Sequence, residues 1–178
     1  MRISRLVMAA CAGLSLAGCS GNAPSHDSAR LGFERQEQGR LQAHFDSVTI
    51  ELRTASVDHL SRSEREARSA LIAWLHEYRD AGRFPRNDRF GPDMPFFRDE
   101  QGTLCAMAYL VARSGRPGMV DRIARTANNA LIPDLRDDGE FTQWLDSTGL
   151  TLAEAARVQP EYRSEGDLTF KHVLHRRW

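Results

Sequence analysis

The segment from Ser61 to Gly82 constrains the fold more than any other part of the chain. Ser61 followed by Glu64 fits a capping box, in which each side chain satisfies the free backbone N–H of the other residue. Apolar residues then recur at helical spacing, and Gly82 tolerates the left-handed conformation in which many helices end. The pattern predicts an amphipathic helix over 62–81, whose inward stripe consists of Ala67, Leu71, Trp74, Leu75 and Tyr78.

Four further short helices are predicted after residue 100. Each has a residue at its start that favours helix initiation, such as a side-chain cap or a proline in the first turn. These starting residues are Thr103, Pro117, Asp138 and Thr151, the last of which forms a second capping box with Glu154. Stop signals follow at Gly115, Gly149 and Pro160.

The remaining segments carry weaker patterns. Residues 31–52 fit both a helix and, near their end, a strand, and we favour a helix that ends near Ala55. Residues 83–98 contain three prolines and four phenylalanines, which predicts a loop whose aromatic side chains fill gaps in a neighbouring core. Residues 168–173 alternate as a short strand would. The expected fold is mostly α: an irregular bundle of five or six short helices with an aromatic-rich loop.

The N-terminus has the pattern of an export signal. Arg2 and Arg5 precede a short apolar run, which is the order of a secretory signal peptide and is too short to span a bilayer. Leu16-Ala17-Gly18-Cys19 resembles a bacterial lipobox, which implies cleavage before Cys19 and attachment of lipid to that cysteine. Ser20 after the cysteine resembles an outer-membrane sorting pattern in Gram-negative cells.

This reading divides the chain into three parts. Residues 1–18 form the signal peptide, residues 19–30 are small and polar and form a lipidated flexible tether, and residues 31–178 form one helical domain. Removing the signal takes away two arginines and no acid, so 22 basic and 24 acidic side chains remain. That balance argues against nucleic-acid binding. Lys171 is the only lysine, and we attribute the abundance of arginine to codon bias.

Cys105 is the one candidate nucleophile of the mature domain. It lies near a predicted helix start, where free N–H groups and the helix dipole favour thiolate. A thiol hydrolase would require His172 or His175 as its base, whereas a small residue in an apolar run is more often an inert core thiol. We therefore expect a buried, unreactive Cys105.

Metal and ligand sites have little support in the sequence. His172-x-x-His175 with Cys105 supplies three metal ligands but no fourth, and the acidic run around Asp138 fails the EF-hand pattern, so no metal and no cofactor are predicted. Asn128 and Asn129 are candidate ligand contacts, although paired asparagines more often form turns.

Three motifs in the second half of the mature chain carry a resemblance. They are Phe97-x-Asp99-x-x-Gly102-x-x-Cys105-Ala106, Gly149-Leu150-Thr151 with Glu154-Ala155-Ala156, and Gln159-Pro160-x-Tyr162. Together they resemble a small family of exported bacterial proteins of uncharacterised activity, and the resemblance implies no reaction. The sequence thus predicts an envelope lipoprotein that binds another envelope protein or a small ligand without catalysis, with a Cys105 hydrolase as the alternative.

Overall fold

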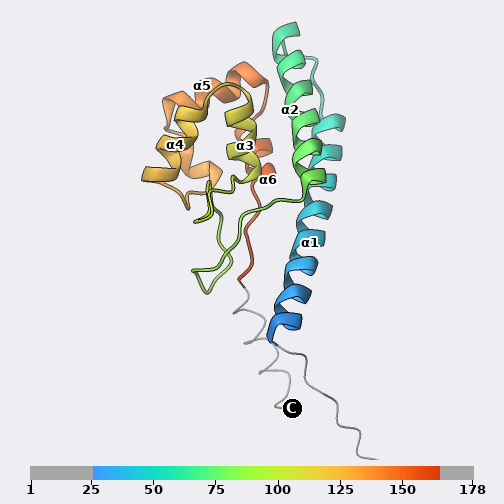
Figure 1. Ribbon diagram of the computed structural model, residues 1–178. Coiled ribbons are helices and arrows are strands. Elements are labelled where there is room, and N and C mark those ends of the chain that lie inside the picture. The colour runs from blue at the N-terminus through green and yellow to red at the C-terminus, as the bar shows by residue number, and fades with distance from the viewer. Residues whose placement is uncertain (1–25, 165–178) are drawn as a thin grey trace, which may run out of the picture.

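The computed structural model describes residues 26–164, which are mostly helical. Within that range the chain forms six α helices and a 3-10 turn, and no strand (Figure 1). The elements are α1 (His26–Thr54), α2 (Arg62–Ala81), α3 (Ala106–Arg113), α4 (Pro117–Thr126), η1 (Ile132–Leu135), α5 (Gly139–Thr148) and α6 (Leu152–Val158). The predicted mostly α fold is confirmed, whereas the proposed strand over 168–173 lies outside the described residues.

Helix α1 is longer than the short helices expected from the sequence. Its 29 residues span about 43 Å at 1.5 Å per residue, and its end at Thr54 confirms the predicted boundary near Ala55. The helix begins at His26, so residues 26–30 do not belong to a flexible tether, and that part of the prediction is wrong. Helix-favouring Glu, Gln and Arg residues between positions 30 and 40 let the helix propagate outward from its buried second half.

Helices α1 and α2 form an antiparallel pair along one side of the molecule (Figure 1). The buried stripe of α1 lies entirely in its C-terminal half, where residues recur three and four positions apart. These residues are Leu41, Phe45, Val48 and Leu52. The N-terminal half of α1 has no such stripe and continues beyond the end of α2.

The predicted caps of α2 are confirmed. The Ser61 hydroxyl accepts a hydrogen bond from the Glu64 N–H, the Glu64 carboxylate accepts one from the Ser61 N–H, and Gly82 ends the helix at φ 61°. Two members of the predicted stripe differ, because Ala67 and Trp74 are only partly buried. Trp74 lies at the edge of the stripe, where the guanidinium of Arg113 sits 5.2 Å from its ring centroid.

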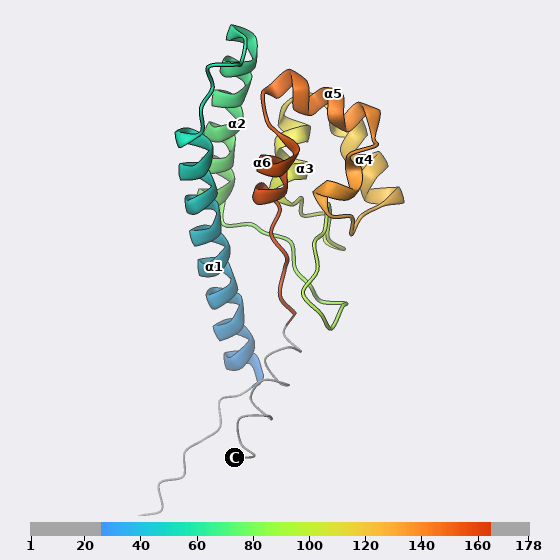
Figure 2. The same ribbon diagram turned by 180° about the vertical axis from the view of Figure 1, so that it is seen from behind.

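Helices α3 to α6 form a second layer against the pair (Figure 2). Helix α2 packs on α3 and α5, and α6 packs on α1 and η1. The predicted starts at Pro117, Asp138 and Thr151 are confirmed, but Thr103 is not a cap. Cys105 takes the N-cap position instead, because residues 98 and 104 pair as an antiparallel bridge and delay the helix by two residues.

A buried arginine joins the two layers. The Arg68 side chain is 4% exposed, and its guanidinium donates to the Gly149 carbonyl (2.8 Å), the Leu52 carbonyl (3.0 Å) and both carboxylate oxygens of Glu154 (3.1 and 2.5 Å). Burial raises the pKa of Glu154, but the hydrogen bonds from Arg68 and Thr151 outweigh it and leave that pKa below its ordinary value. Arg68 therefore ties α2 to the end of α1 and to the start of α6.

Candidate functional site

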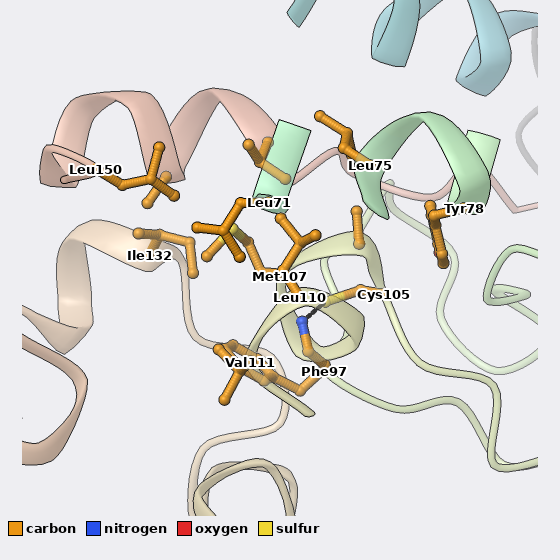
Figure 3. Close-up of a cluster of buried hydrophobic side chains, with 14 of the residues drawn as sticks. Leu71, Leu75, Tyr78, Phe97, Cys105, Met107, Leu110, Val111, Ile132 and Leu150 are labelled. Atoms are coloured by element: carbon orange, nitrogen blue, oxygen red, sulfur yellow. Dashed lines mark hydrogen bonds between the residues drawn. The ribbon is translucent and has the colours of Figure 1, made fainter. Parts of the chain in front are cut away.

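Cys105 is fully buried and serves as a structural cap. Its Sγ atom accepts a hydrogen bond from the Ala108 N–H at 3.3 Å, and none of its surface is exposed to solvent. Figure 3 shows the side chain among buried core residues that include Phe97 and Leu110. Burial raises the pKa of the Cys105 thiol to about 12, which outweighs the opposite effect of the N–H groups at the helix start. The helix start therefore does not produce a thiolate here.

The structure does not assemble a catalytic pair around this sulfur. His172 and His175, the predicted bases, lie outside the described residues. Within residues 26–164 no histidine forms a hydrogen bond with Cys105, and no group of three or more His, Cys, Asp or Glu side chains could hold a metal ion.

None of the helices between residues 26 and 164 combines the length and the apolar character that a membrane span requires.

Asn128 and Asn129 are engaged by the backbone of the aromatic-rich loop. The Asn128 amide accepts from the Arg98 N–H (2.9 Å) and donates to the Arg98 carbonyl (2.8 Å), while the Asn129 amide donates to the Pro95 carbonyl (2.8 Å). These bonds give both amides a structural role in fixing the loop against the end of α4.

The motif from Phe97 to Cys105 forms a closed turn. The Asp99 side chain, which is 8% exposed, accepts from the backbone N–H groups of Arg86 (3.1 Å) and Thr103 (2.7 Å). Gly102 adopts φ 83°, and the Cys105 N–H donates to the Phe97 carbonyl at 3.0 Å. The residues behind the family resemblance therefore determine the shape of this loop.

The C-terminal motif is likewise structural. The Gln159 amide accepts from the Ile132 N–H (2.9 Å) and donates to the Ala130 carbonyl (3.0 Å). The backbone of Tyr162 pairs with that of Met94 in both directions, at 3.2 and 2.9 Å. The segment after α6 is thereby held against the aromatic-rich loop.

A cleft of about 450 Å³ lies between the N-terminal half of α1 and the segment from Gly82 to Thr103. It forms there because α2 ends at Gly82, beside Gln38, while α1 continues for three further turns. Buried polar side chains hold the opposite wall. Besides Asp99, the Asn87 amide donates to the carbonyls of Pro92 (2.9 Å) and Tyr162 (3.0 Å). The cleft is thus bounded by a loop with fixed internal bonds.

The lining of the cleft combines apolar and charged side chains. Its apolar members are Leu31, Phe33, Leu41, Phe84 and Pro85, of which Leu31 is 53% exposed. Its charged members are five arginines and four carboxylates: Arg30, Arg35, Arg83, Arg86, Arg163, Glu34, Glu37, Asp88 and Asp99.

Most of these carboxylates already have partners. Glu34 accepts from Arg30 and lies 3.3 Å from the guanidinium of Arg86, and Glu37 is bound by Arg40 at 2.5 Å. Both oxygens of Asp99 accept backbone N–H groups, as described above. Asp88 is exposed at the rim.

Three arginines of the cleft have no ion-pair partner among the described residues. Arg35, Arg83 and Arg163 are exposed, and none of their guanidinium groups forms an ion pair or a hydrogen bond with another described residue. The sequence interpretation missed them because it treated arginine as a compositional bias. They come from three distant segments, so no local motif marks them.

Comparisons with known proteins add no assignment: no family model, no curated protein and no solved structure matches this chain.

Proposed function

We propose that this chain is a membrane-anchored lipoprotein of the bacterial cell envelope, facing the periplasm from the outer membrane, whose domain binds a ligand in the α1 cleft without catalysis. The single observation that carries the binding role is the cleft itself. Its loop wall is fixed by Asn87 and Asp99, and three of its arginines have no partner among the described residues. A preformed concave site with a few polar groups is the usual form of a small-ligand site.

The chemistry of Cys105 supports a non-catalytic role. A nucleophilic cysteine needs access and thiolate, and the structure gives this thiol neither. The hydrolase alternative would require His172 or His175 to reach a sulfur that is enclosed by core side chains. No contact of the described residues favours that alternative.

The anchor is tested by substitution of Cys19. Lipid attachment at Cys19 predicts that labelled palmitate enters the wild-type protein and that the protein fractionates with the outer membrane. Cys19→Ala should abolish the label and leave an unprocessed or soluble form, whereas Cys105→Ser, the matched control, should keep both label and location. Palmitate in the Cys19→Ala protein, or wild type in the soluble fraction, contradicts the anchor.

The binding role is tested by obstructing the cleft. Gln101 lines the cleft, is exposed and has no hydrogen bond among the described residues, so Gln101→Trp should fill space without disturbing the fold. Gln143→Trp, on the exposed face of α5, is the matched control. Native mass spectrometry of the detergent-extracted proteins should show a bound molecule in wild type and Gln143→Trp, and its loss in Gln101→Trp. An equal result for the two variants refutes the cleft as the binding site.

A further inference from the structure

We propose that the cleft binds the anionic phosphate headgroup of a phospholipid in the membrane to which the protein is anchored. This inference rests on the proposed function and names the ligand of the same site. Three features support it: the charge of the lining, the position of the cleft and the exposed apolar side chain beside it.

The charge of the lining matches one phosphate group. Arg35, Arg83 and Arg163 line the cleft, and their guanidinium groups form no ion pair with a described carboxylate. Guanidinium is planar, always charged and able to donate two parallel hydrogen bonds to phosphate oxygens. Because the lining contains five arginines and four carboxylates, its net charge of +1 suits a singly charged phosphodiester better than a polyanion such as nucleic acid.

The position of the cleft puts it near the bilayer. Six residues separate Cys19 from His26, where α1 begins, and at full extension that segment reaches about 25 Å. The start of α1 lies at the end of the molecule opposite α5 (Figure 1), and the cleft is lined by residues 30–38 of α1, close to that start. A lipid attached to Cys19 therefore keeps these arginines within reach of the headgroup region.

An apolar group accompanies the charges. Leu31 is one of three large hydrophobic side chains that are strongly exposed in the described part of the chain. Leu31 and Phe33, two residues further along α1, both line the cleft. An amphiphile places phosphate and hydrocarbon side by side, so cationic and apolar side chains next to each other fit a lipid at a membrane surface.

The test uses the mature chain, residues 19–178, with Cys19→Ser, so that no acyl chain contributes to binding. Sedimentation is measured with vesicles of phosphatidylcholine alone and with vesicles that also contain phosphatidylglycerol. We expect binding to the second kind only, weakened by added salt because the attraction is electrostatic. Each arginine near an anionic surface contributes about a fivefold factor, so Arg35→Gln/Arg83→Gln/Arg163→Gln should bind about a hundredfold more weakly.

A matched triple variant separates the cleft from net charge. Arg53, Arg116 and Arg125 are exposed, lie outside the cleft and form no ion pair with a described residue, so their change to Gln removes the same charge elsewhere. The affinity of this control for the vesicles should stay within a fewfold of the wild-type value. Equal loss in both triple variants, or wild-type binding by the cleft variant, overturns the proposal.

A soluble phosphate ester distinguishes the source of the ligand. If glycerol 3-phosphate binds in titration calorimetry while the vesicles do not, the cleft takes a free phosphate ester and the lipid proposal is overturned. If native mass spectrometry finds another molecule, lost in Gln101→Trp, the binding function stands and the lipid assignment fails. If neither vesicles nor any molecule depends on the cleft, both proposals fail together.

Discussion

Alkylation of Cys105 should be far slower in the folded protein than that of an exposed cysteine. Burial raises the pKa of this thiol from an ordinary value of 9.0 to about 12, which lowers the thiolate population near neutral pH about a thousandfold. The lack of solvent access slows the reaction further, because the sulfur has no exposed surface. With a domain stability of about 5–15 kcal/mol, globally unfolded molecules are fewer than about one in several thousand. Cys105 should therefore be alkylated only in molecules that have unfolded.

The assay is a time course of iodoacetamide labelling, followed by mass spectrometry, on the mature chain with Cys19→Ser. Cys105 is then the only thiol. The control carries Cys105→Ala with Ser69→Cys, since Ser69 is exposed on α2. In buffer the control should label at least about a thousandfold faster than Cys105, and in urea the two rates should converge. Rapid labelling of native Cys105, at a rate comparable to the control, would refute the reasoning and revive the hydrolase alternative.

Three further predictions concern stability, measured by urea or thermal unfolding. Arg68→Met should lower the free energy of unfolding by about 3–5 kcal/mol, because it leaves Oε1 of the partly buried Glu154 and the Gly149 carbonyl without the donors that Arg68 supplies. Unchanged stability would show that Arg68 does not join the layers. The folded-state pKa of Glu154 is depressed, so the stability it contributes is fully present above the unfolded-chain pKa of about 4 and is lost as the pH falls through the folded value. Glu154→Gln should therefore make the free energy of unfolding depend less steeply on pH below pH 5, roughly one unit above the ordinary carboxyl pKa. An unaltered pH dependence in that range would contradict the depressed pKa of Glu154. Gly149→Ala should destabilise the fold by about 2–4 kcal/mol, since φ is 63° and the added Cβ would lie 3.3 Å from both Cβ and the backbone oxygen of Glu64. Gly102→Ala, with φ 83° and open space, should destabilise it by only about 1–2 kcal/mol. Equal losses in the two glycine variants would show that the contact at Gly149 carries no cost.

The sequence alone determined features whose physical causes are local. The capping box of Ser61 and Glu64, the left-handed Gly82 and the second box at Thr151 all involve atoms within a few residues of one another. Burial of Cys105 was equally predictable, because a small residue in an apolar run is seldom exposed.

Other features depended on pairing between distant segments. Thr103 fails as a cap because its neighbour Leu104 bridges to Arg98, and Cys105 takes its place. Trp74 satisfies the helical spacing, yet it lies at the edge of the stripe because packing against α3 and α5 determines which face of α2 is covered. The start of α1 at His26 was missed because a polar helix without an apolar stripe has the composition of a linker.

The candidate site belongs wholly to the tertiary structure. Arg35 lies on α1, Arg83 follows α2 and Arg163 follows α6, so 128 positions separate the first from the last. No spacing rule connects such residues, because their proximity arises only when α1 continues beyond the end of α2 and the loop is held by Asn87 and Asp99. Local sequence thus determined which segments are helical, while the lengths and packing of the helices decided where charge gathers around a cavity.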